Sequence, residues 1–250
     1  MRTVTATRYV TPLREGGSLP ALVEASDDGL YVTKLRGAGQ GPKALVAEAI
    51  CGEIARALGL PVPEVVLVEL AVELSHAEPD PEIQELLQAS AGTNLGLDFL
   101  PGSLPYTPAG RVQPSPELAA DVVWFDALVE NVDRSPRNPN LLVWHGAMWL
   151  IDHGAALYRQ HSGGGLGEGG GSFPLSGQHV LLPVAGSIVE ADERLAAKVD
   201  QGLLERVVEH VPMAWLDAAE PAEVYVEDLL ARLSGDRPWV TMAEEARGGA

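Results

Sequence analysis

The sequence has few of the features that would tie it to an oxidising compartment, a nucleic acid or a membrane. Cys51 is the single cysteine in 250 residues, so no intramolecular disulfide can form and a reducing cytoplasm is expected. Only 17 basic residues stand against 35 acidic ones, giving a net charge of -18. Nucleic acid and anionic lipid both require clusters of Lys and Arg, so neither is expected as a partner. No segment approaches 18 consecutive apolar residues, which argues against a membrane span.

The first hundred residues show a pattern typical of strands with one long helix. Alternating residues and the turn segments "EGGS" and "SDDG" predict strands within residues 1–35. An apolar 3-4 spacing predicts a helix over residues 42–59, with Cys51 on its core face. The stretch 63–74 is β-rich, 75–92 is an acidic loop with a short helix, and a last strand lies in 93–106.

The second half of the chain reads as mostly helical. Ser115 is an N-cap followed by proline, which predicts a helix over residues 115–131. Two further helical patterns cover residues 191–210 and 221–234, and the tail from 244 is expected to be frayed. This change from predicted strands to predicted helices places a boundary near residue 101, with one lobe over 1–101 and a second over 102–250.

The segment between these helices concentrates acids and amides around a hairpin. Asp133 and Asn138 are five residues apart, the spacing of the catalytic carboxylate and the metal-binding amide in protein kinases. Two apolar runs then form a hairpin, which ends in Asp152-His153-Gly154, an Asp-x-Gly pattern where kinases have D-F-G. Because a hairpin brings its ends together, Asp133, Asn138 and Asp152 are expected to converge and hold Mg²⁺ and a phosphate. Pro139 and Asn140 precede the strand, so Asn140 is an alternative metal ligand.

The first lobe contains residues that match the other parts of such a site. Lys34 lies in an expected strand and Glu48 on the helix that follows, an arrangement that holds the nucleotide phosphates in kinases. Glu53, on the other edge of the helix, is an alternative to Glu48. Two glycine-rich stretches could cover the phosphates, "GGS" at Gly16, Gly17 and Ser18 or "GAGQG" at residues 37–41.

At this point the chain resembles a family. "AEAICGEIARALGLPVPEVVLVEL" and "NVDRSPRNPNLLV…LIDHG" are similar to the helix-strand segment and the catalytic and metal loops of HipA-like kinases, which are related to phosphatidylinositol-kinase-like enzymes. The resemblance covers about residues 31–158. It implies an α+β, bilobal protein-kinase-like fold, with a β-rich nucleotide-binding N-lobe and a mostly helical C-lobe that carries the catalytic and metal loops. It also implies ATP, Mg²⁺ and an adenine hinge at Asp98, Phe99 and Leu100.

The function expected from these features is phosphotransfer from Mg-ATP, with Ser or Thr of a protein as the acceptor that the resemblance implies. Asp133 would orient the acceptor, Lys34 and Glu48 would hold phosphates, and Asn138 and Asp152 would bind Mg²⁺. A small-molecule or lipid-headgroup kinase and a non-catalytic nucleotide-binding pseudokinase are the alternatives. The glycine-rich residues 161–172 follow at the distance of an activation segment, with Arg134 or Arg137 as a charge partner for a phosphate on it.

Overall fold

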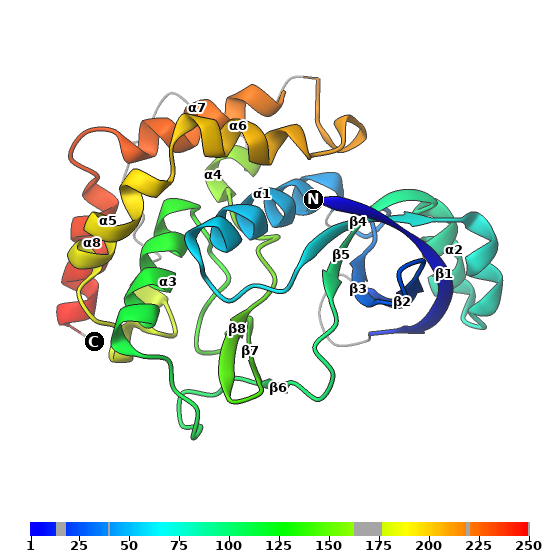
Figure 1. Cartoon of the computed structure of the whole chain (residues 1–250), viewed down its shortest axis with the longest axis horizontal. Coiled ribbons are helices and arrows are strands. Elements are labelled where there is room, and N and C mark those ends of the chain that lie inside the picture. The colour runs from blue at the N-terminus through cyan, green and yellow to red at the C-terminus, as the bar shows by residue number, and fades with distance from the viewer. Residues whose placement is uncertain (14–18, 40, 163–176, 219–220, 250) are drawn as a thin grey trace.

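The computed structural model describes the whole chain apart from residues 14–18, 40, 163–176, 219–220 and 250. Figure 1 shows a β-barrel at one end of the molecule and a group of helices at the other, with the long helix α1 (Gly41–Leu58) running between them. Among the described residues, none of the helices is both long and apolar enough to cross a lipid bilayer.

The barrel is formed by five strands, β1 (Arg2–Pro12), β2 (Ala21–Ala25), β3 (Leu30–Lys34), β4 (Val65–Leu70) and β5 (Gly92–Asp98). They close in the order β1-β2-β3-β5-β4. The neighbours pair antiparallel except β1 and β4, which run parallel with Arg2 opposite Val66. Closure leaves no open sheet edge, and the inward side chains, such as Val23 and Val68, form a small core of their own.

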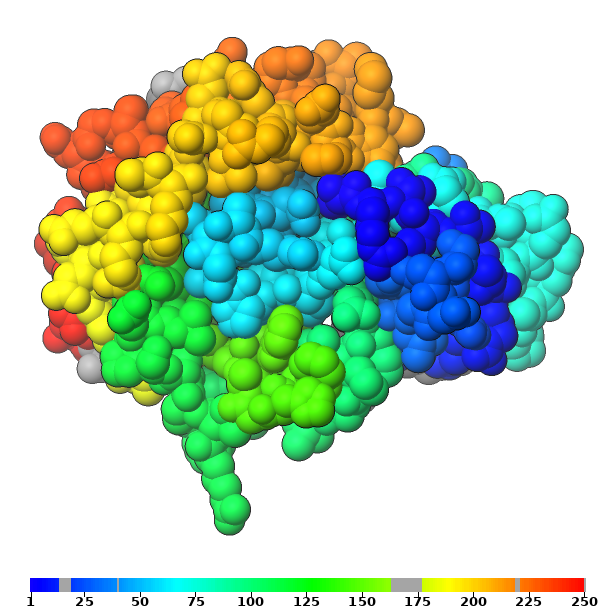
Figure 2. Space-filling view, in the orientation of Figure 1, coloured from blue at the N-terminus to red at the C-terminus, as the bar shows by residue number. Residues whose placement is uncertain are grey.

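Helix α1 is buried on several sides because the barrel and the helices both pack on it. Ile50 and Ile54 have no exposed surface, and Gly52 leaves room for Val65 on strand β4. Figure 2 shows α1 on the surface of this face, bordered by the β1 end of the barrel and by the helices of the second half. Gly59, with φ of 84°, ends the helix in the left-handed conformation that glycine adopts readily. The expected helix over 42–59 therefore matches α1 closely.

A 3₁₀ helix and α2 pack against the barrel, and Ile83 and Leu87 of α2 join its core. The β-rich stretch expected over 63–74 is shorter than predicted, because β4 ends at Leu70 and a 3₁₀ helix, η1 (Val72–Ala77), follows. Asp80 then caps α2 (Pro81–Ala89) by accepting a hydrogen bond from the Glu82 N–H.

A short connection after β5 leads to the helical half. There β6 (Leu104–Pro105), β7 (Leu141–Trp144) and β8 (Ala147–Leu150) form a small sheet. The helices are α3 (Pro116–Leu128), α4 (Tyr158–His161), α5 (Ile188–Leu195), α6 (Gln201–Glu209), α7 (Ala222–Leu233) and α8 (Pro238–Gly248), with 3₁₀ turns η4 (Leu182–Val184), η5 (Ala196–Lys198) and η6 (Met213–Trp215). The Ser115 hydroxyl accepts from the Leu118 N–H and caps α3 as the sequence predicts.

Two predictions for the helices after residue 187 are wrong. The pattern over 191–210 is not one helix, because Asp200 caps a second helix, α6, by accepting from the Leu203 N–H. The tail is not frayed over 244–248, because α8 continues to Gly248 and is anchored by Trp239, which is fully buried and packs on Trp124 with ring centroids 5.6 Å apart.

Candidate active site

The β7–β8 hairpin brings the two ends of the polar segment together. Its turn, His145-Gly146, has positive φ at both residues, 48° and 76°, as a two-residue hairpin turn of the twisted type requires. The strands pair in register, and the Ile151 N–H then donates to the Asn140 carbonyl at 3.1 Å. The register thus places Asn140 opposite the residue that precedes Asp152, so Asn140 stays an alternative to Asn138 near that carboxylate.

Asp133 is held by the two asparagines that follow it. The Asn138 side-chain amide donates to Asp133 Oδ2 at 2.8 Å. The Asn140 amide donates to the Asp133 carbonyl at 2.6 Å and to Oδ2 at 3.2 Å. From the other side, the Asp133 N–H donates to the Asn131 amide oxygen at 3.1 Å. Both following amides use their N–H groups on the carboxylate, which leaves their oxygens directed elsewhere.

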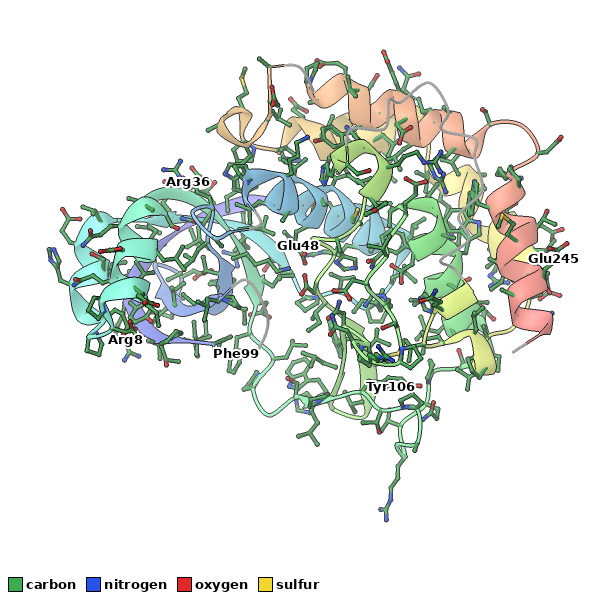
Figure 3. The ribbon with its side chains drawn as sticks, turned by 180° about the vertical axis from the view of Figure 1, so that it is seen from behind. Arg8, Arg36, Glu48, Phe99, Tyr106 and Glu245 are labelled. Carbon is green, nitrogen blue, oxygen red and sulfur yellow. The ribbon has the colours of Figure 1, made fainter. Side chains whose placement is uncertain are left out.

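Lys34 joins the barrel to the second half of the chain. Its ammonium is 2.7 Å from Glu48 Oε2 on α1 and 2.5 Å from Asp152 Oδ1 after β8. Glu48 is fully buried, whereas the Asp152 side chain is 44% exposed. Glu53, the alternative partner, instead lies near the chain's amino group and Arg56 at 3.8 and 3.9 Å. The structure therefore brings Lys34, Glu48 and Asp152 together, with Glu48 at the centre of the molecule in Figure 3.

The charges in this cluster stabilise one another strongly. Burial favours the uncharged form of Lys34, but the carboxylates of Glu48 and Asp152 outweigh it and raise the pKa of the ammonium. Burial also favours the uncharged form of Glu48, yet the ammonium of Lys34 and then His153 lower its pKa to about 2. The Lys34 ammonium therefore lies between two carboxylates, one fully buried and one partly exposed.

His153 is more buried than Asp152 and Gly154, the residues on either side of it. It has no exposed surface, and its Nδ1 is 3.6 Å from Glu48 Oε1, beyond hydrogen-bond length. Both ring nitrogens and that oxygen are buried and have no hydrogen-bond partner among the residues that the structure describes. The ring also packs edge-on against Phe125 with centroids 5.9 Å apart. Asp152, just before it, has φ of 58°, a strained conformation of the kind that often marks functional segments.

A buried charged cluster behind Asp133 was missed by the sequence analysis. Asp126, on α3, accepts from Arg134 Nε and lies 2.9 Å from His179 Nε2. Arg134 also donates to the carbonyls of Asn140 and Ile151, at 2.5 and 3.4 Å, and so ties both ends of the hairpin. Arg134 is 2% exposed, so this residue is not available as a partner for a phosphate on residues 161–172. The signal in the sequence was an acid, Asp126, inside the apolar run over residues 122–128.

The pKa values of this cluster follow from burial and pairing. Burial alone would raise the pKa of Asp126, but the charge of Arg134 and then His179 hold it well below its usual range. Burial lowers the pKa of His179. Its Nδ1 accepts from the Leu181 N–H at 3.1 Å, so Nε2 carries the proton donated to Asp126.

The C-terminal end of α3, which leads into this loop, is capped by a distant arginine. Arg232 on α7 donates to the carbonyls of Leu128 and Ala127, both at 2.7 Å. It also pairs with Glu130 at 3.0 Å, and Glu130 has a left-handed φ of 52°. Because of this turn, α3 ends at Leu128 rather than near residue 131 as predicted.

The remaining predicted nucleotide-binding residues lie along the barrel. Asp98 is the last residue of β5, Phe99 and Leu100 follow it, and the Phe99 N–H donates to the Leu30 carbonyl at 2.9 Å. Asp98 pairs with Tyr31 in the sheet, three residues from Lys34 and roughly 10 Å along the strand. Partial burial, and then the charge of Glu64, raise the pKa of Asp98.

Of the two glycine-rich stretches, only the second lies mostly within the described residues. Gly16, Gly17 and Ser18 lie outside the described residues. In the alternative stretch, Gly37 packs against the end of α2, where its N–H donates to the Ser90 hydroxyl at 3.1 Å and a Cβ would collide with that oxygen. The close packing against Ser90 therefore explains why position 37 is glycine, and no bound phosphate is needed to account for it.

The described residues include no cluster of three or more His, Cys, Asp or Glu side chains with the geometry of a metal site. A site that combines Asp152 with an asparagine would not count as such a cluster, because asparagine is not one of these four residue types. Carboxylate and amide oxygens are the donors that hard divalent cations prefer. The chemistry of Asp152, Asn138 and Asn140 therefore fits such a cation.

Comparison with known proteins places this geometry in a family. No curated protein sequence gave a match. The Helicobacter pylori proinflammatory kinase CtkA has a TM-score of 0.62 at 12% identity, with 98% of each chain covered. The Golgi casein kinase, in a structure with Mn/ADP bound, has a TM-score of 0.54 at 12% identity, covering 98% of this chain and 74% of that one. A second Golgi casein kinase structure gives 0.52 at 14% identity, covering 98% and 72%. These likenesses show a mixed α/β kinase-like fold.

A family model described as HipA-like kinase matches residues 7–167, more than half of the sequence, and the chain therefore belongs to the HipA-like kinase family.

Proposed function

We propose that this protein transfers the γ-phosphoryl group of ATP to a serine or threonine hydroxyl of a protein. The observation that carries the proposal is the Lys34 ammonium between Glu48 and Asp152, at 2.7 and 2.5 Å. Such a cation, held by a helix carboxylate, fixes nucleotide phosphates in kinases. The residues 1–101 would form the nucleotide-binding lobe and 102–250 the catalytic lobe.

Asp133 is the residue we assign to the acceptor. Its carboxylate is oriented by the amides of Asn138 and Asn140, at 2.8 and 3.2 Å. In the transfer, the bond between the γ-phosphorus and the oxygen of ADP breaks and a bond to the acceptor oxygen forms. The proton of the acceptor hydroxyl passes to Asp133. The two amides would keep that carboxylate in place while the hydroxyl approaches.

Asp152 and Asn138 are the proposed ligands of Mg²⁺, with Asn140 as the alternative to Asn138. The exposed side of Asp152 and the amide oxygen of Asn138 supply the oxygen donors that Mg²⁺ prefers. When bound, Mg²⁺ neutralises the charge that develops on the phosphate oxygens. The Golgi casein kinase, a structural relative, was solved with Mn/ADP, which supports a nucleotide and a divalent metal here too.

The adenine is assigned to the connection at Asp98, Phe99 and Leu100. This segment follows β5, the neighbour of the strand that carries Lys34, and leads to the helical half of the chain. The loop at Gly16, Gly17 and Ser18, proposed to cover the phosphates, lies outside the described residues.

The test is transfer of labelled γ-phosphate from Mg-ATP to protein substrates and to the kinase itself. Asp133→Asn removes the proton acceptor with little change in shape, and we expect it to lower turnover roughly 100-fold or more. Asp236→Asn, at an exposed position between α7 and α8, is the matched control and should transfer phosphate like the wild type. Equal activity of Asp133→Asn and wild type would refute the assignment, and absence of transfer by the wild type would favour a pseudokinase.

A further inference from the structure

A cavity of about 570 Å³ opens beside the loop that carries Asp133. Its size is within the range of sites that bind small ligands or side chains. One wall comes from residues 135–137, directly after Asp133 and Arg134 in the chain, and the other from residues 177–183. A group bound in this cavity would therefore lie next to the residue assigned to the acceptor hydroxyl.

Both walls of the cavity are fixed by hydrogen bonds. Ser135 and Asn138 exchange backbone bonds, each N–H donating to the other carbonyl at 3.1 Å, which closes a tight turn with Arg137 inside it. The Val180 N–H donates to the Arg134 carbonyl at 3.0 Å and joins the two walls. Behind them, Asp126 pairs with Arg134, which precedes the first wall, and with His179 in the second. The cavity is thus formed before any ligand arrives, which lowers the entropy lost on binding.

Among the described residues, the lining combines apolar surface with one arginine side chain that has no partner. Pro136, Val180, Leu182 and Pro183 supply apolar groups. Arg137 is exposed and, within the described part of the chain, makes no hydrogen bond or ion pair. In a chain with 35 acidic and 17 basic residues, most arginines near acids find a partner, as the neighbouring Arg134 does. An unpaired guanidinium here is available for an acid supplied by another molecule.

We propose that this cavity binds the acceptor protein beside its phosphorylated residue and that Arg137 selects an acidic side chain in that segment. The inference rests on the proposed phosphotransfer function, because Asp133 fixes where the acceptor hydroxyl lies. Arg137 lies four positions after Asp133, a span of at most about 14 Å. The acid is therefore expected within about four residues of the acceptor serine or threonine, with an apolar neighbour against the apolar part of the lining.

The test uses a peptide library with one serine and with Glu, Gln or Lys fixed in turn at each of the four positions on either side. We expect the wild type to prefer Glu over Gln roughly tenfold in kcat/KM at one or two positions. Arg137→Glu should lose this preference and favour Lys at the same positions. Arg206→Glu, on the exposed side of α6, adds the same charge away from the cavity and should keep the wild-type preference.

Binding of the same peptides, labelled with a fluorophore and measured by anisotropy without nucleotide, separates the two proposals. Acid-dependent binding that Arg137→Glu abolishes supports the cavity, even if no phosphate is transferred and the proposed function fails. A wild type that binds and phosphorylates Glu, Gln and Lys peptides equally, or that prefers Lys as its net charge of -18 would favour, overturns the cavity proposal and leaves the proposed function standing.

Discussion

Replacing Glu48 by glutamine tests whether the buried ion pair with Lys34 organises this site. Glutamine keeps the volume of the side chain but removes its charge. Lys34 is then left with Asp152, whose side chain is 44% exposed and more easily drawn away by water. We expect Glu48→Gln to lose both stability and phosphotransfer, while α1 keeps its packing.

The magnitude follows from the pKa of Glu48. Its pKa falls from an ordinary 4.5 to about 2, and each unit corresponds to about 1.4 kcal/mol, so the folded protein gains about 3 kcal/mol from the charged form. Because the carboxylate is fully buried, solvent screening takes little from this value. We therefore expect urea denaturation at neutral pH to show a loss of about 3 kcal/mol, at the lower end for a broken buried pair.

The pH dependence has a definite sign. The folded-state pKa of Glu48 is lowered, so its stabilisation is complete above the unfolded value of 4.5 and is lost as the pH falls toward 2. The difference in unfolding free energy between wild type and Glu48→Gln should stay constant from about pH 5 to 8 and shrink to about 2 kcal/mol near pH 3.5.

Glu53→Gln is the matched control for this measurement. Glu53 lies on the same helix, is 22% exposed, and within the described part of the chain has only the long contacts at 3.8 and 3.9 Å given above. Its replacement should change stability by less than about 0.5 kcal/mol. The reasoning is refuted if the two variants unfold alike, or if the effect of Glu48→Gln is the same at pH 7 and pH 3.5.

Three further changes test the rest of the cluster. Asp152→Asn should abolish Mg²⁺-dependent binding of ATP, measured by calorimetry, without unfolding the protein; full ATP affinity would exclude Asp152 as a ligand. Asn138→Ala should raise the Mg²⁺ concentration for half-maximal activity more than Asn140→Ala does, and the reverse order would assign the metal to Asn140. His153→Phe should lower the free energy of unfolding by about 1 kcal/mol, because the imidazole helps to keep the buried Glu48 carboxylate charged. An unchanged or higher melting temperature would show that the imidazole does not support Glu48.

The parts of the site that could be predicted are those with local signals. The alternating pattern around Lys34 predicts a strand, and the apolar spacing around Glu48 predicts a helix. The glycine-containing turn of the hairpin brings Asp152 back toward Asn140. These signals depend on backbone preferences and on side-chain periodicity, which can be read without knowledge of the tertiary structure.

The parts that could not be predicted depend on contacts between distant residues. Nothing local to Asp126 shows that it will pair with Arg134 and His179, because a buried charge is stable only with partners that other elements supply. The parallel pairing of β1 with β4 also joins segments more than sixty positions apart. The break at Asp200 did have a local signal, an aspartate three residues before Leu203, but the continuous apolar pattern concealed it.

The capping of α3 by Arg232 leads us to expect that the loop carrying Asp133 becomes ordered only when α7 is in place. The bonds from Arg232 to Leu128 and Ala127 span 104 and 105 residues, and closing a chain segment of that length costs more conformational entropy than closing a local turn. Until α7 docks, the carbonyls at the end of α3 lack these donors, and the loop that begins at Asn131 has no fixed starting point. Amide hydrogen exchange should therefore report the loop and α7 as one cooperative unit, opening and closing together even though a hundred residues separate them.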